Sequence, residues 1–295
     1  MPETRLPNFL IIGAMKAGTT SIYRDLLNHP QVFFPIDKEP GNLNDDRVLT
    51  KAGSDDYAAM FARSIPTQIC GEASTTYTKL PEIAGVPQRA RRLLGKDLRV
   101  IYLVREPLAR TISQHYHEFC IQWVPRNINQ AVRQFPRLIQ FSRYAMQIKP
   151  WIEALGREQV HVVRFEDYVA DRPSYIAQLC QFLGIDPRPD LVEPEAVYNK
   201  SEGKPHDAGL AAWLRKRSIY RSLIRPWLPI GTKDRLRTWL MPQSPARPEP
   251  PSAATVDYIL DQVWDDAVEL ARILAVDEPL WDLNGVRRSY QEVTR

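Results

Sequence analysis

Several features that define classes of protein are missing from this chain of 295 residues. Its three cysteines form no Cys-x-x-Cys pair and cannot all pair with one another, which argues against a zinc site and against a disulfide framework. No apolar run approaches the length of a membrane span, and the first residues lack the apolar region of a signal peptide. The chain shows no internal repeat and no nucleic-acid recognition module. These absences predict a cytoplasmic protein with reduced thiols, no metal and no nucleic-acid partner.

What the chain has is the composition of one globular domain. Hydrophobic residues make up 44% of it, and its net charge of +4 is mild and suits anionic ligands. Apolar segments typical of buried strands alternate with helical segments, including a helix over 173–183 that Gly184 ends. The predicted strands are 8–12, 68–74, 99–104 and 159–168. The pattern predicts a single α/β domain over 1–295, with a central, mainly parallel sheet and helices on both faces.

A glycine-rich turn follows the first predicted strand and leads into a helix that begins with three hydroxyl residues, 19–21. Backbone N–H groups in such a turn, together with those of the first helical turn, point at one spot and favour an anion there. Gly13 and Gly18 let the backbone approach the ligand, and Lys16 adds a positive charge. The turn predicts a phosphate site, although similar turns also begin many ordinary helices.

The spacing of the two glycines matches the loop that binds nucleoside triphosphates, but the next residue does not. That pattern continues with a lysine where this chain has Thr19, and the lysine of this chain lies inside the turn, at Lys16. From there a lysine cannot bridge the β- and γ-phosphates as P-loop NTPases require. A P-loop kinase or NTPase is kept as an alternative, which would also need an apolar strand ending in a Mg²⁺-binding aspartate.

A second anion-binding pattern begins where the predicted strand 99–104 ends. Residues 105–113 read Arg-x-Pro-x-x-Arg-x-x-Ser, which predicts a turn and then a helix. Arg105 can form a bidentate pair with a phosphate, and Ser113, about two turns into the helix, can donate to the same group. The alternative is that Arg105 caps its own strand or pairs with Glu106. Together the two patterns predict a ligand with two anionic groups.

These patterns resemble those of sulfotransferases that use 3′-phosphoadenosine 5′-phosphosulfate (PAPS). Residues 14–20 are similar to the 5′-phosphosulfate loop of that family without its proline, and 105–113 are similar to the segment that holds the 3′-phosphate. The resemblance implies a P-loop architecture shared with nucleoside kinases, PAPS as co-substrate, the bisphosphate PAP as product, and no metal. The cofactor-binding residues that it implies are Lys16, Ala17, Gly18, Thr19, Thr20, Ser21, Arg105 and Ser113.

A third segment, 33–43, resembles the Lys-Glu-Pro-His-Phe-Phe segment of carbohydrate-type sulfotransferases, with Gly-Asn-Leu at 41–43 in place of the last three residues. In that group the glutamate takes the proton from the acceptor hydroxyl, which implies that Glu39 is the catalytic base. Lys16 would then meet the charge that develops on the leaving 5′-phosphate. The alternative is a loop glutamate that is solvated or paired with Lys38.

Residues around these motifs have weaker assignments. His115 and His117 compete with Glu39 for the role of base, but they lie beyond Ser113 on the predicted helix, so we interpret them as pocket-lining or structural. Residues 71–74 resemble a Gly-Glu-x-Ser signature near the acceptor site, and a plain strand-to-loop transition explains them equally well.

The resemblance covers residues 8–205 and returns at 271–281. Within it, 199–205 look like the late basic loop that closes over the cofactor in relatives. This likeness implies that Lys200 and Lys204 are further cofactor contacts, and a solvated polar turn is the alternative.

The least family-like part of the chain runs from residue 210 to about 251, and we expect 205–252 to form a basic, aromatic lid and a proline-rich connector. Within them, 210–240 hold eight Lys or Arg against one acidic residue, with tryptophans interleaved. Such a segment can lie on an anionic membrane surface, or it can pack its apolar side chains on the core, and we favour the second. The proline-rich stretch 242–252 is expected to be a mobile connector. The C-terminal segment 253–295 is expected to be helical, with a helix that begins at Thr255.

The three motifs in this order predict a PAPS-dependent sulfotransferase, which would move a sulfuryl group to a hydroxyl of a saccharide, a glycolipid or a secondary metabolite. The missing signal region differs from Golgi-anchored animal relatives and predicts a soluble, bacterial-type enzyme. A non-catalytic member that binds only nucleotide or a membrane surface is a second alternative, because the residues after Glu39 depart from the family.

The acceptor pocket is expected in loops whose sequences do not encode a substrate. The expected loops are 40–65, 117–145 and 205–250. Trp123, Tyr144 and Trp151 are candidates for stacking on sugar rings, and core packing explains them equally well. The sequence determines neither the acceptor nor the oligomeric state.

Overall fold

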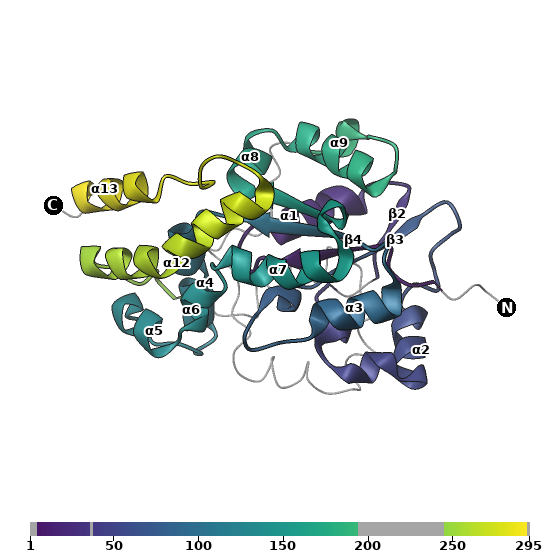
Figure 1. Ribbon diagram of the computed structural model, residues 1–295, viewed down its shortest axis with the longest axis horizontal. Helices are drawn as coiled ribbons and strands as arrows, with labels where there is room; N and C mark the ends of the chain where they lie inside the picture. Colours follow the sequence, from purple (N-terminus) through teal and green to yellow (C-terminus); the bar gives the residue numbers. More distant parts are fainter. Residues whose placement is uncertain (1–4, 36–37, 194–244, 294–295) are drawn as a thin grey trace.

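The computed structural model describes residues 5–35, 38–193 and 245–293 and shows an α/β fold around a five-stranded sheet (Figure 1). All strand pairs are parallel, and the strand order is β2-β3-β1-β4-β5. The strands are β1 (Phe9–Gly13), β2 (Val32–Phe33), β3 (Ile69–Ala73), β4 (Arg99–Val104) and β5 (Val160–Arg164). The predicted fold class is confirmed.

The position of β1 between β3 and β4 creates the crevice of this fold. Every residue of β1 is buried, and Ile11 lies opposite Ala73 on one side and Ile101 on the other. A continuous apolar run of this kind is typical of a parallel strand that is covered on both faces. Because the chain fills the sheet on one side of β1 and then on the other, the carboxyl ends of β1, β3 and β4 meet at a topological switch point, where ligands bind in such sheets.

Helices cover the sheet from two sides (Figure 1). On one side α9 contacts α1 and α8, and on the other α7 contacts α3 and α12. The helices are α1 (Thr19–Leu27), α2 (Lys51–Ala59), α3 (Val86–Leu94), α4 (Pro107–Cys120), α5 (Ile128–Gln134), α6 (Arg137–Gln140), α7 (Tyr144–Leu155), α8 (Phe165–Ala170), α9 (Arg172–Leu183), α12 (Ala253–Leu274) and α13 (Leu283–Val293). Short 3₁₀ turns are η1 (Asn42–Asn44), η2 (Asp46–Leu49), η3 (Thr75–Thr78), η4 (Arg157–Gln159) and η5 (Pro189–Leu191).

One expected element divides into two. The strand predicted over 159–168 ends at Arg164, and α8 begins at the next residue. Glu166 and Asp167 fall in the first turn of α8, where acidic side chains favour the positive end of the helix dipole. The helix predicted over 173–183 is present as α9, and Gly184 ends it in the left-handed conformation.

The long C-terminal helix begins two residues before the expected Thr255. Its N-cap is Ser252, whose Oγ accepts a hydrogen bond of 3.3 Å from the backbone N–H of Thr255. A serine hydroxyl at this position satisfies one of the unpaired N–H groups of the first turn, which explains the earlier start.

The described part of the proline-rich stretch, residues 245–252, forms hydrogen bonds with side chains of α4 and of the segment that follows it. The expected mobility of this connector stays a prediction. The Tyr116 hydroxyl donates to the carbonyl of Pro245 at 3.1 Å, and the Arg126 side chain donates to the carbonyl of Arg247 at 3.2 Å. The other residues of the expected lid, with Lys200, Lys204 and the stretch 210–240, lie outside the described residues.

A buried ionic cluster ties the three helices of one side together. Asp25 of α1 accepts hydrogen bonds from the Tyr168 hydroxyl of α8 at 2.5 Å and from two nitrogens of Arg172 of α9 at 2.5 and 3.2 Å. None of the three residues is more than 6% exposed. Since α1 starts at the glycine-rich turn, this cluster fixes the helix that carries the turn.

We expect Asp25→Ala to destabilise the protein strongly, because it leaves the buried Arg172 guanidinium without its carboxylate. The loss should be about 3–5 kcal/mol in the free energy of unfolding. It is measured by urea denaturation followed by circular dichroism. Asp55→Ala is the control, because Asp55 pairs with Lys51 on the surface, where both side chains are more than half exposed. An equal shift in both variants would contradict the role of the cluster.

Candidate active site

The glycine-rich turn lies at the switch point, where β1 ends and α1 begins. The Ala14 N–H donates to the carbonyl of Leu103 at 2.7 Å, which attaches the turn to β4. Gly18 is the N-cap of α1 and has a φ of +92°, and Lys16 has a φ of +69°. The first turn of α1 therefore starts directly beside the crevice, with N–H groups that have no partner within the helix.

Both glycines of the turn are required by close packing as well as by backbone conformation. A Cβ on Gly13 would lie 2.1 Å from the Thr78 Oγ1, which donates to the carbonyl of Ile12. A Cβ on Gly18 would lie 2.5 Å from the ring of Phe165, the first residue of α8. The Gly-x4-Gly spacing is thus imposed from both sides by tertiary contacts.

Arg105 extends from the end of β4 to the glycine-rich turn. Its guanidinium donates to the carbonyl of Lys16 at 3.3 Å and lies over the ring of Phe165 with 5.0 Å to the centroid. Glu106 accepts from the N–H groups of Leu108 and Ala109, so that it caps α4 rather than serving as the main partner of Arg105. The structure brings the two predicted anion-binding elements together in one place.

Ser113 and the three hydroxyl residues of α1 differ in exposure. Ser113 is half-buried on α4, as are Thr20 and Ser21 on α1, whereas Thr19 is buried. Ala17 is also buried, and its N–H donates to the carbonyl of Ala14 at 3.1 Å. The predicted cofactor residues of the turn thus divide into backbone donors and partly exposed hydroxyls.

The second arginine of the 105–113 pattern points into the protein. Arg110 is fully buried and donates to the Ser142 Oγ at 2.5 Å, to the Leu138 carbonyl at 2.5 Å and to the Met15 carbonyl at 3.5 Å. Burial lowers the pKa of this arginine below its ordinary value. The sequence assigned it no role, and the structure shows that it joins α4 to α6 and to the glycine-rich turn.

Glu39 follows β2 and is fixed at the end of β3. Its N–H donates to the carbonyl of Ala73 at 2.9 Å. One carboxylate oxygen accepts from the N–H and the hydroxyl of Thr75 at 2.6 and 3.0 Å, and the other accepts from the Lys38 Nζ at 2.6 Å. The pairing with Lys38 that we considered as an alternative is present, and it leaves the carboxylate 35% exposed at the crevice edge of the sheet.

A buried carboxylate lies directly behind this loop. Glu72 of β3 is fully buried and accepts hydrogen bonds from the hydroxyls of Tyr57, Ser74 and Tyr77. Burial raises its pKa, whereas the three hydroxyl donors act in the opposite direction. The Glu72 carboxylate is thus enclosed by hydroxyl donors of the protein itself.

Lys79 is a functional candidate that the sequence reasoning missed. Desolvation lowers the pKa of its ammonium group, and the nearby Glu39 carboxylate partly offsets this effect. The Nζ lies 5.7 Å from the centroid of the Phe141 ring. The signal that could have found it is a lysine shortly after the Gly-Glu-x-Ser segment, directly after the turn η3 that follows β3.

The histidine considered as an alternative base and the aromatic residues considered for sugar stacking differ in burial. His115 is buried, its Nε2 lies 2.9 Å from the carbonyl of Pro125, and burial lowers its pKa, which fits a structural role. Tyr144 and Trp151 are buried in the core, whereas Trp123 is 62% exposed beyond the end of α4. Of these three aromatic candidates, Trp123 is therefore the one that a ligand can reach.

No three His, Cys, Asp or Glu side chains among residues 5–35, 38–193 and 245–293 are grouped so as to hold a metal ion. Over the same residues, no helix combines the length and the apolar character that crossing a membrane requires.

Comparisons with known proteins agree with the resemblance of the motifs. A family model of the sulfotransferase domain matches residues 6–200. The membrane-associated sulfotransferase kil1 of Dictyostelium discoideum is 38% identical over 125 residues, which cover 41% of this chain and 25% of the relative. Heparan sulfate glucosamine 3-O-sulfotransferase 3B1 of Mus musculus is 25% identical over 241 residues, which cover 75% of this chain and 59% of the relative.

The crystal structure of a sulfotransferase from Alicyclobacillus acidocaldarius has the same fold. It matches with a TM-score of 0.62 at 21% identity and covers 93% of this chain and 98% of its own. This chain spans less than two thirds of the length of these two curated relatives. The family model nevertheless covers more than half of the residues, and the chain therefore belongs to the sulfotransferase domain family.

Proposed function

We propose that this protein transfers a sulfuryl group from PAPS to a hydroxyl group of a saccharide, a glycolipid or a secondary metabolite. The contact between Arg105 and the carbonyl of Lys16 carries this proposal, because it joins two anion-binding elements into one site for a ligand with two phosphate-bearing ends. The match to the sulfotransferase domain supports it. Among the relatives, one is named as a glucosamine 3-O-sulfotransferase, which favours a saccharide acceptor.

The residues of the crevice fit a doubly anionic nucleotide. Backbone N–H groups from Gly18 to Thr20, with the hydroxyls of Thr20 and Ser21, would hold the 5′-phosphosulfate at the start of α1. Ala17 stays a predicted contact. Arg105 and Ser113 would hold the 3′-phosphate. Lys200 and Lys204 lie outside the described residues and stay predicted contacts.

The side chains at the crevice edge supply the chemistry of transfer. Glu39 would take the proton of the acceptor hydroxyl while the acceptor oxygen forms its bond to sulfur. The bond between sulfur and the 5′-phosphate oxygen breaks, and Lys16 would stabilise the negative charge that develops on that oxygen. Thr75 holds one oxygen of Glu39 with two hydrogen bonds, and the other oxygen accepts from the Lys38 Nζ. The products are the sulfate ester and PAP.

Three further expectations stay predictions. Contact of the stretch 210–240 with a membrane surface concerns residues outside the described part of the chain. A cytoplasmic location and a bacterial type are expectations from the sequence alone.

We expect Arg105→Ala to weaken the binding of PAP by at least about tenfold, because it removes charge-assisted hydrogen bonds to the 3′-phosphate. Isothermal titration calorimetry with PAP measures this change. Arg99→Ala is the matched control, because Arg99 lies at the opposite end of the same strand and bonds to the carbonyl of Leu183.

The same titration with ATP and Mg²⁺ separates the alternatives. Weak ATP binding is expected, because the lysine that follows the second glycine in NTPases is replaced by Thr19. Tight ATP binding that is unchanged in Arg105→Ala would favour a P-loop kinase or NTPase instead.

We expect Glu39→Gln to reduce the rate of sulfuryl transfer by about 10²–10⁴-fold, because the amide cannot accept the hydroxyl proton. The affinity for PAP should stay unchanged. The rate is measured as PAP release from PAPS with a panel of oligosaccharide acceptors. Glu158→Gln, at the opposite edge of the sheet in η4, is the control. Full activity of Glu39→Gln would place the base elsewhere.

A further inference from the structure

The three hydroxyl groups around Glu72 all donate their protons to its carboxylate. Tyr57 donates to one carboxylate oxygen, and the hydroxyls of Ser74 and Tyr77 donate to the other at 2.8 and 2.5 Å. Glu72, Tyr57, Ser74 and Tyr77 are all at most 3% exposed. An ionised carboxylate only accepts hydrogen bonds, so it obliges each neighbouring hydroxyl to turn its proton inward.

A hydroxyl whose proton points at Glu72 has its lone pairs free for another donor. The Ser74 Oγ accepts from the N–H of Gly41 at 3.1 Å, and the Tyr77 Oη accepts from the N–H of Leu43 at 3.2 Å. Gly41 and Leu43 belong to the loop that begins with Glu39. The carboxylate is therefore connected through two hydroxyls to the backbone of the loop that carries the proposed base.

Burial makes this arrangement specific. Burial raises the pKa of both tyrosines well above the ordinary value, so their hydroxyls keep their protons and act as donors to Glu72. If either hydroxyl turned around, the proton would face an N–H group of the loop and leave a buried donor without an acceptor, which is costly.

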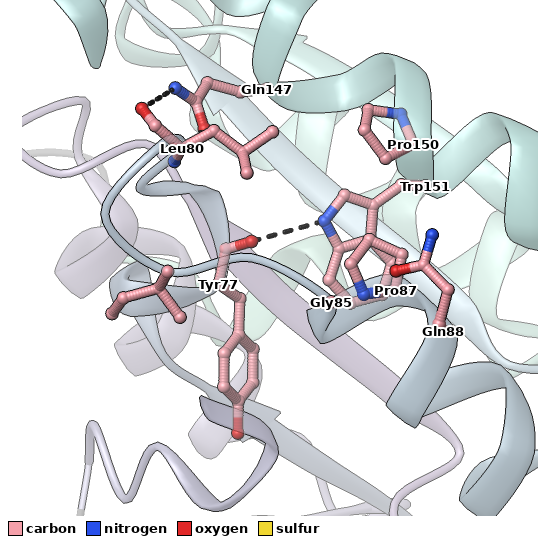
Figure 2. A pocket seen from close by; sticks show the side chains of 9 residues that line it. Tyr77, Leu80, Gly85, Pro87, Gln88, Gln147, Pro150 and Trp151 are labelled. Carbon is pink, nitrogen blue, oxygen red and sulfur yellow. Dashed lines mark hydrogen bonds between the residues drawn. The ribbon is translucent and has the colours of Figure 1, made fainter. Parts of the chain in front are cut away.

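Tyr77 is fixed at its other end as well. Its carbonyl accepts from the indole Nε1 of Trp151 at 3.3 Å, and the neighbouring Leu80 is bonded on both its N–H and its carbonyl to the side chain of Gln147. Figure 2 shows the Tyr77 ring extending away from these contacts, with its hydroxyl at the far end. Because α7 holds the backbone of η3, the Tyr77 hydroxyl is a rigid support rather than a mobile one.

We propose that Glu72 is a positioning residue that holds residues 39–43, the base loop, through Ser74 and Tyr77. In this way it places the Glu39 carboxylate for catalysis. The proposal rests on the proposed function, in which Glu39 takes the acceptor proton. Thr75, which holds the Glu39 carboxylate directly, lies between these two residues, so the same support also sets its position.

The chain offers a matched pair of variants. Tyr57→Phe and Tyr77→Phe each remove one buried phenol that donates to Glu72, so their structural cost is similar. Only the Tyr77 hydroxyl also accepts from the base loop, at the N–H of Leu43. Ser74→Ala removes the second support, at the N–H of Gly41.

For Tyr77→Phe and Ser74→Ala we expect kcat to fall by about tenfold or more, because a small displacement of a catalytic group is costly. The KM for PAPS and the affinity for PAP should stay within about twofold of the unchanged protein, since the glycine-rich turn is not part of this support. Peptides that cover residues 39–43 should exchange their amide hydrogens faster in both variants. Tyr57→Phe should resemble the unchanged protein in all three measurements.

The outcomes separate this proposal from the proposed function. Equal losses of kcat and equal exchange in Tyr57→Phe and Tyr77→Phe would overturn the support by Tyr77, as would unchanged exchange at 39–43. If the unchanged protein bound no PAP, the proposed function would fail, while the exchange measurement would still decide whether the hydroxyls hold the loop. Unfolded variants would be recognised by circular dichroism, and the two Tyr→Phe changes keep the core volume.

Discussion

The pairing of β1 with β3 on one side and β4 on the other is the constraint on which the rest of this structure depends. It places the glycine-rich turn between the ends of two strands that come from distant parts of the sequence. The Ala14–Leu103 hydrogen bond continues this pairing beyond the end of β1. As a result, Arg105 from β4 and the loop held at the end of β3 reach the same edge of the sheet.

Two buried charges stabilise this edge, and neutral groups surround both of them. Arg110 donates to a hydroxyl, an amide and backbone carbonyls, and Glu72 accepts from three hydroxyls. Neither forms a direct ion pair with another residue of the described chain. Since an unsatisfied buried charge is very unfavourable, each charge requires its neighbours to keep one orientation. Arg110 thereby stabilises the glycine-rich turn, and Glu72 stabilises the loop that carries the proposed base.

The local patterns predicted much of this arrangement. The strands β1, β3, β4 and the start of β5, the turn at 13–18 and the position of Arg105 at a strand end were readable, because apolar runs, glycine spacing and proline act over a few residues. The short strand β2 was not predicted, and the predicted bounds differ at the end of β5 and at the start of α12. These features, like the hydrogen bond between Tyr116 and Pro245, depend on contacts that a local pattern does not contain.

By itself the sequence determined the fold class, the cofactor motifs and Glu39 as a candidate base, because each of these depends on the order and spacing of nearby residues. The tertiary structure alone decided that Arg110 turns inward, that Lys79 lies near Glu39 and that Glu72 supports the base loop. The physical reason is that burial and hydrogen-bond partners arise where several elements meet. The same arginine, lysine or glutamate in a sequence is equally compatible with a solvated surface until those elements are placed.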